Sequence, residues 1–207
     1  MEQALSSGIG RPLAGLILTA LVVMGSPGPS TMSVTAVGAA FGLRRSLAYL
    51  SGLVLGTVAV LLAVAAGIVS MLLSVPRLAP VLLAVSAAYI LYLACKIATA
   101  PPLRQQDEAA SAPSFAGGLL LAVANPKAYA AITAVFASAP LALDSHLIEA
   151  MLKISVLTMM IVAIHSVWLL AGASLSRILR HPIGARLINL LLAAVLIVTT
   201  VMALMHA

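Results

Sequence analysis

The stretch "VVMGSPGPSTM", Val22 to Met32, interrupts a long apolar run near the start of the chain. Two prolines flank a glycine at positions 27–29. Proline has no backbone N–H and clashes with the preceding helical turn, so the interior of a helix tolerates it poorly. This stretch therefore predicts that the first apolar segment is a broken helix, and the rest of the chain has to explain the break.

The composition places the chain in a membrane. Of its 207 residues, 63% are hydrophobic and 8% are charged, which no ordinary soluble domain matches. Apolar stretches of about 20 residues can cross a bilayer as helices. The sequence predicts an all-α, multi-pass fold that is surrounded by lipid, with six spans at roughly 12–34, 47–73, 78–98, 115–139, 151–175 and 184–205.

Other classes of partner are disfavoured. The net charge of +6 could indicate nucleic acid, but the basic residues flank apolar spans and no aromatic platform is interleaved with them. The single cysteine, Cys95, excludes an internal disulfide and a CxxC pair. The methionines form no metal-binding constellation. We therefore expect no nucleic acid, no metal and no cofactor.

The distribution of basic residues predicts the orientation, because Lys and Arg accumulate in cytoplasmic loops. With both termini outside, the inner loops hold more of them than the outer segments do. The inner set is Arg44, Arg45, Lys96, Arg104, Arg177, Arg180 and Arg186, and the outer set is Arg11, Arg77 and Lys153.

The stretch at 100–114, rich in Pro, Ala and polar residues, reads as a cytoplasmic linker between two halves, 1–99 and 115–207. Each half holds three predicted spans, and Pro27 in the first span corresponds to Pro126 in the fourth. An odd number of crossings inverts the second copy. We therefore expect one transmembrane domain built as a 3+3 inverted repeat with broken helices 1 and 4, an arrangement typical of transporters.

The second breaker lies in "LLLAVANPKAYAAI", Leu119 to Ile132. Asn125 can cap a new half-helix with Pro126 at its first position, and Gly28 can do the same ahead of Pro29. Helix N-termini attract anions. Two such ends that enter from opposite faces would meet near the middle of the bilayer.

Two interpretations of the breakers are open: simple kinks, or exposed backbone that lines a cavity. Two matched breakers favour the cavity. The residues expected to contact a substrate there are Pro27, Gly28, Pro29, Ser30, Thr31, Asn125, Pro126 and Lys127.

Two further side chains have open roles. Lys127 lies inside a predicted span. A charged side chain at that depth is energetically costly, which makes it a candidate functional residue. It could pair with a substrate carboxylate, or bond carbonyls that the helix break leaves free. His165 could relay protons, because its charge changes near neutral pH. A neutral histidine bonded to a neighbouring helix is the favoured reading.

The pairs Gly38/Gly42 and Gly52/Gly56 have GxxxG spacing, which allows close contact between helices. They predict packing and give only weak support to a homodimer.

These motifs together resemble the LysE/RhtB family of amino-acid exporters. The family pattern of an early Pro-Gly-Pro is matched at 27–29, its third-span motif by "SAAYILYLA" at 86–94, and its "FxxGlllxxxNPKA" by "FAGGLLLAVANPKA" at 115–128. The resemblance implies six helices, export of small amino acids or related metabolites, and a proton-motive driving force. This chain has Ser30-Thr31 where the family often has Asp or Asn, and no Asp or Glu inside a predicted span.

The resulting hypothesis is a secondary transporter, not an enzyme, with no catalytic residues. It would export a small amino acid or related zwitterion across a bacterial inner membrane by alternating access. One alternative is an exporter of an inorganic ion on the same fold, which should show intramembrane Asp, His or Cys clusters. Another is an intramembrane enzyme, which needs an activated nucleophile, paired aspartates or paired cysteines. A structural scaffold would have no reason to break two helices.

Overall fold

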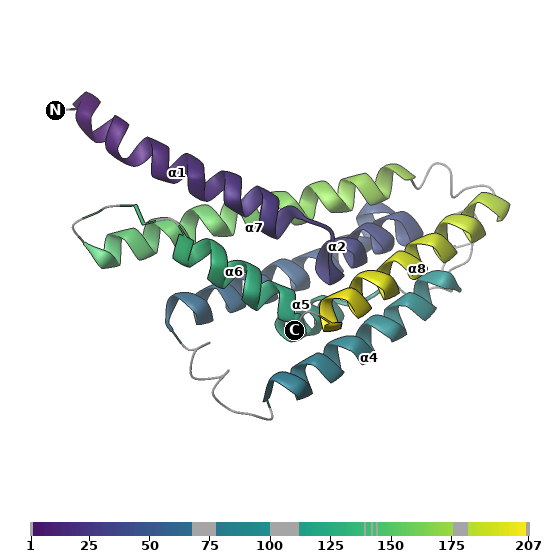
Figure 1. The fold of residues 1–207 in the computed structure, drawn as a ribbon. Coiled ribbons are helices and arrows are strands. Elements are labelled where there is room, and N and C mark those ends of the chain that lie inside the picture. The colour runs from purple at the N-terminus through teal and green to yellow at the C-terminus, as the bar shows by residue number, and fades with distance from the viewer. Residues whose placement is uncertain are drawn as a thin grey trace.

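The computed structural model describes residues 2–67, 78–99, 112–138, 140, 141, 143, 145–175 and 182–205. Every regular element within these ranges is an α-helix (Figure 1). The helices are α1 Glu2–Gly25, α2 Pro29–Ala65, α4 Leu78–Ala98, α5 Phe115–Ala124, α6 Pro126–Ser138, α7 His146–Leu175 and α8 Pro182–Met205.

Both predicted breaks are present. Helix α1 ends at Gly25, and α2 begins at Pro29 with Gly28 as its N-cap in an extended conformation. Helices α5 and α6 are separated by Asn125 alone and are bent by 62° relative to each other. The predictions that Pro29 and Pro126 each start a half-helix are therefore confirmed.

Helix α2 folds back on itself at Gly42, where the backbone has φ 75° and ψ 168°. The hydroxyl of Tyr49 donates to Ser33 Oγ at 3.0 Å. In a straight helix, 16 residues would separate these positions by about 24 Å. The predicted spans left a loop between residues 34 and 47, and this loop was too long. The chain reverses at Gly42 alone, because glycine adopts a positive φ without strain.

Several helices of the described chain are long and apolar enough to cross a membrane. They include Gly8–Gly25, Pro29–Ala65, which the reversal at Gly42 divides into two arms, and His146–Ser174. The bent pair Phe115–Ala124 and Pro126–Ala137 is long and apolar enough when it is counted as one span. Helices α4 and α8 hold shorter apolar segments at Ala87–Ala98 and Arg186–Val198. The end of the second predicted span, most of the linker and the last predicted inner loop fall in 68–77, 100–111 and 176–181, outside the described residues.

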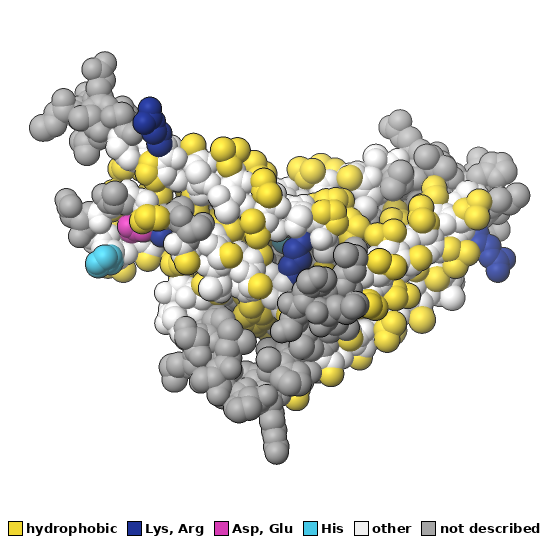
Figure 2. All heavy atoms as spheres, viewed as in Figure 1, with side chains coloured by type: hydrophobic (Ala, Val, Ile, Leu, Met, Phe, Trp, Pro, Cys, Tyr) yellow, Lys and Arg dark blue, Asp and Glu magenta, His cyan; other side chains and the backbone are white. Residues whose placement is uncertain are grey.

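The surface suits lipid rather than water. Large apolar side chains point outward along the helices, and Val22 and Met159 are 71% and 73% exposed. Figure 2 shows apolar side chains spread over the visible face, with few charged groups among them. In water such continuous apolar surface would be a liability, so the exposed faces are those of a multi-pass membrane protein.

Two clusters of buried apolar residues hold the helices together, and α2 belongs to both. One joins α2 to α4, α5, α7 and α8, and the other joins α2 to α1, α6 and α7. Figure 1 shows α4 and α8 side by side, with α1 crossing α7. Because α2 links both clusters, it fixes the first break relative to the second.

Glycines allow α2 to approach α5 closely. A Cβ on Gly52 would collide with the carbonyl of Phe115, and one on Gly118 would collide with the carbonyl of Tyr49. The Gly52/Gly56 pair is thus used inside the chain. Gly42 forms the reversal and not a packing pair with Gly38, so these pairs no longer support a homodimer.

Candidate functional site

The first break spans Ser26, Pro27 and Gly28. Two side chains bond within it: Ser26 Oγ donates to the carbonyl of Val23 at 2.9 Å, and the Gly28 N–H donates to Thr31 Oγ1 at 2.9 Å. The Thr31 hydroxyl lies 3.2 Å from the Gly28 carbonyl. Thr31 therefore closes the start of α2 from within, in the manner of a cap.

The second break is confined to Asn125, whose backbone is extended. Its side-chain oxygen accepts from the Lys127 N–H at 3.1 Å, and its own N–H donates to the Ala122 carbonyl at 3.3 Å. The Tyr129 hydroxyl donates to the Val123 carbonyl at 2.8 Å. The asparagine thus caps α6. Hydrogen bonds within residues 122–129 also satisfy backbone carbonyls that lack a helical donor because Pro126 has no N–H.

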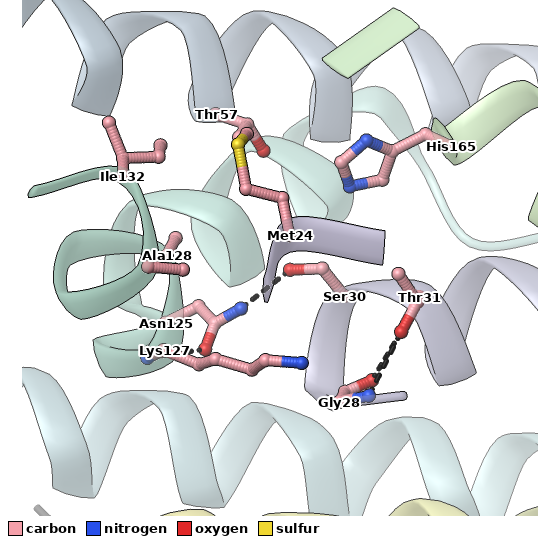
Figure 3. Close-up of a pocket in the computed structure, with 11 residues that line it drawn as sticks. Met24, Gly28, Ser30, Thr31, Thr57, Asn125, Lys127, Ala128, Ile132 and His165 are labelled. Atoms are coloured by element: carbon pink, nitrogen blue, oxygen red, sulfur yellow. Dashed lines mark hydrogen bonds between the residues drawn. The ribbon is translucent and has the colours of Figure 1, made fainter. Parts of the chain in front are cut away.

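The two breaks contact each other, about 100 residues apart in the chain (Figure 3). Asn125 Nδ2 donates to Ser30 Oγ at 2.7 Å, and both side chains are buried. Lys127 Nζ lies 2.7 Å from the Ser26 carbonyl, 2.7 Å from Ser26 Oγ and 2.9 Å from the Pro27 carbonyl. Of the two roles considered for Lys127, bonding of the freed carbonyls is observed.

Helix α7 completes the site. Trp168 Nε1 donates to the carbonyl of Gly25, the last residue of α1, at 3.1 Å. The Thr35 hydroxyl lies 3.2 Å from the Trp168 carbonyl, which ties α7 to α2. Sequence reasoning did not find this bond, although the position of Trp168 three residues after His165 puts both on one helix face.

His165 points into the space between the breaks (Figure 3) and is buried. Its Nδ1 lies 2.8 Å from the Ile161 carbonyl of the same helix. The favoured bond to a neighbouring helix is therefore not what holds this ring. A carbonyl can only accept, so Nδ1 carries a hydrogen and the neutral ring keeps Nε2 as an acceptor.

The breaks enclose a cavity of about 40 Å³. It has room for a few water molecules, each of which needs roughly 10–15 Å³. Among the predicted site residues, the cavity is lined by Gly28, Ser30, Thr31, Asn125, Lys127 and His165, whereas Pro27, Pro29 and Pro126 shape the breaks beside it. It is also lined by Met24, Thr57, Ala128, Ala131 and Ile132.

Part of this additional lining could have been found in the sequence. Ala128, Ala131 and Ile132 follow Lys127 at helical spacing and share one face of α6. Thr57 comes from the second arm of α2 and reaches the site only because the chain reverses at Gly42. No local signal in the sequence marks it.

The charges around the cavity are uneven. Its described lining contains one lysine and no Asp or Glu.

Helix α7 starts at His146 and includes Glu149, so the predicted boundary of the fifth span at 151 was too late. One carboxylate therefore does lie in a candidate span. Glu149 pairs with Lys153 at 2.8 Å, one helical turn away, and is not among the cavity residues.

Comparisons with known proteins identify the family of this chain. The family model of the LysE type translocator matches residues 21–206. The Cysteine/O-acetylserine efflux proteins of Salmonella typhimurium and Salmonella typhi are each 39% identical over 85 residues, which is 41% of this chain and 42% of the relative. The match thus spans about two fifths of those relatives' length. No solved structure matches the chain. Because the family model covers both breaks and all helices from α2 onward, the chain belongs to the LysE type translocator family.

Proposed function

We propose that this protein exports a small amino acid or a related zwitterionic metabolite across the bacterial inner membrane. Membership of a translocator family supports the transport of a small molecule. The name of the Salmonella relatives, Cysteine/O-acetylserine efflux protein, supports an amino acid as substrate and the outward direction of transport. The substrate would bind inside the transmembrane domain, and lipid would surround the protein.

One observation carries the proposal: the two helix breaks meet and line one cavity, to which Ser30, Thr31, Asn125 and Lys127 contribute polar groups. Backbone that leaves the helix at membrane depth is tolerated where it is buried in protein or lines a cavity. Here Ser30 and Thr31, in the first turn of α2, line the cavity, and the positive end of that helix favours a carboxylate. Lys127 supplies a full positive charge beside it.

The transport cycle would be alternating access around this site. A cavity of about 40 Å³ is too small for an amino acid, which has the bulk of several waters. Binding therefore needs the breaks to move apart. We propose six spans in a 3+3 inverted repeat, in which α1 with its break and α5–α6 with theirs are equivalent elements that rock against each other.

His165 is the proposed proton carrier for coupling to the proton-motive force. Its ring faces the cavity, and Nε2 is the acceptor in the neutral form. A proton taken up there would add a second positive charge close to Lys127. Mutual repulsion of these cations would then favour a different arrangement of the breaks.

A vesicle experiment tests the proposed function. Inverted membrane vesicles that contain the protein should accumulate labelled cysteine, O-acetylserine or another small amino acid when a proton gradient is imposed, and collapse of the gradient should abolish the accumulation. Compounds are screened one at a time against vesicles without the protein. If inorganic ions accumulate and no amino acid does, the proposal is wrong.

Both termini are proposed to lie outside, on the basis of the charge distribution. In a Cys95→Ala background, single cysteines at residues 8 and 145 should react with an impermeant thiol reagent from outside, and one at 107 should not. Labelling of 107 with protection of 8 would invert the orientation. A homodimer stays part of the proposal and would have to use surfaces other than the Gly52/Gly56 face of α2.

A further inference from the structure

The ammonium of Lys127 occupies a complete set of acceptors. An ammonium group has three N–H donors and no acceptor. Around Nζ lie three oxygens, the Ser26 carbonyl and Ser26 Oγ at 2.7 Å and the Pro27 carbonyl at 2.9 Å. We call these three atoms the oxygen cage. It is built by the first break and not by the helix that carries Lys127.

The cage attracts a cation for reasons that do not depend on Lys127. Its carbonyls follow the end of α1, where the unpaired C=O groups of a helix carry partial negative charge. The lysine reaches them because residue 28 has no side chain. A Cβ at Gly28 would lie 2.7 Å from Lys127 Cδ and 2.8 Å from Nζ. The stem of the lysine therefore crosses the break through the space that this glycine leaves.

A zwitterionic substrate poses a problem that the cage can solve. Its ammonium needs acceptors, but the described lining of the cavity contains no carboxylate. Its carboxylate needs a donor, but the three donors of Lys127 are already engaged. A second ammonium placed beside Lys127 without any rearrangement would be repelled by it.

Building on the proposed function, we infer that the oxygen cage is the ammonium subsite of the substrate and that Lys127 is its resident competitor. The α-ammonium of the substrate replaces Nζ on the Ser26 and Pro27 oxygens. The displaced Lys127 then pairs with the substrate carboxylate. Each charge keeps a partner through the exchange, and the departure of the lysine stem from Gly28 enlarges the cavity.

The exchange explains selection for zwitterions. An amine that lacks a carboxylate could take the cage only by leaving Lys127 unpaired in a partly buried site, which is costly. A carboxylic acid that lacks an amine has no group that can replace Nζ. Only a molecule with both groups displaces the lysine and also gives it a new partner.

The test measures binding of methylammonium to purified protein in detergent by calorimetry. Lys127→Ala should bind methylammonium at least tenfold more tightly than the wild type, because the cage is vacant and the stem is gone. A transported amino acid should compete with methylammonium in that variant. The matched control is Lys153→Ala, which removes a buried lysine that bonds the Phe136 carbonyl at 3.1 Å and does not line the cavity. It should leave the weak binding of the wild type unchanged.

Gly28→Ala provides a second route that keeps the charge. Its Cβ would displace the lysine stem, so methylammonium binding should again become tighter than in the wild type, and this variant decides the matter if Lys127→Ala does not fold. Equal binding by the wild type and the folded variants would overturn the inference, as would tighter binding of Na⁺ in place of methylammonium. Failure of amino-acid uptake in vesicles, with the amine result intact, would instead count against the proposed function.

Discussion

The two helix breaks look equivalent in the sequence but are held in different ways. The second break is one residue long, and Asn125 and Tyr129 satisfy it from within a short stretch of the chain. The first break is three residues long, and the carbonyls of Ser26 and Pro27 bond Lys127 from α6. The carbonyl of Gly25, just before the break, bonds Trp168 from α7, whereas that of Gly28 is bonded within α2.

This difference indicates which break changes during transport. A locally satisfied break keeps its hydrogen bonds when its helix moves as a unit. A break whose hydrogen-bond partners lie on other helices loses those bonds as soon as α1 and α6 move apart. The carbonyls are then left unpaired inside the membrane, which is costly. The first break is therefore the one that gains from a substrate able to replace the lost donors.

Among single substitutions, the largest effect on transport is expected for Lys127→Met, which keeps an apolar stem and deletes the cation. In the proposed exchange the displaced lysine pairs with the substrate carboxylate, and a charge-assisted hydrogen bond of this kind is worth about 1.5–3 kcal/mol. Apparent affinity for an amino acid in vesicle uptake should fall by roughly one to two decades. Lys127→Arg should restore only part of it, because a planar guanidinium fits a different set of acceptors.

The same variant tests the role of the charge. An amino acid should lose much more transport than its uncharged carboxamide analogue, provided that the wild type carries both. An equal loss for the two compounds would show that Lys127 only satisfies the first break.

A smaller effect on transport is expected for Asn125→Ala, which removes the local cap of α6 and the bond to Ser30. Loss of an N-cap costs about 1 kcal/mol, and a buried hydrogen bond contributes about 0.5–1.5 kcal/mol more. Thermal unfolding in detergent should therefore occur at a lower temperature, while uptake by the folded protein falls only a few fold. If Asn125→Ala damages transport more than Lys127→Met does, the distinction between the two breaks is wrong.

The smallest effect is expected for Ser26→Ala, which deletes one of the three acceptors of Lys127 and leaves both carbonyls. Because both carbonyls remain, we expect a loss at the lower end of the range for one hydrogen bond, about 0.5 kcal/mol, which corresponds to roughly a twofold weaker apparent affinity. The control is Ser51→Ala on α2, an exposed serine that bonds only the Ala48 carbonyl of its own helix among the contacts seen in the described chain. If the two variants have equal apparent affinities for the amino acid, Ser26 Oγ is not part of the substrate site.

The sequence predicted the features that depend on local backbone chemistry. Proline lacks an N–H wherever it stands, so the breaks at Gly28 and Asn125 followed from the residues themselves. The reversal at Gly42 did not, because a glycine in an apolar helix can as well be a packing contact. The partner of Lys127 stayed open for a related reason: a long flexible side chain reaches several carbonyls, and only the packing of α1 against α6 decides among them.

The proposal that the two breaks form one substrate site is tested most directly by closing the first break. Replacing Pro27, Gly28 and Pro29 together by Ala should let α1 continue into α2, since alanine favours a helix and remains apolar. Uptake of the transported amino acid into inverted vesicles should then fall to the level of vesicles without the protein, although the variant still inserts into the membrane. Pro12→Ala, which replaces a proline inside α1 and outside the break, should transport like the wild type. Normal uptake by the triple variant would contradict the proposal and reduce the first break to a dispensable kink.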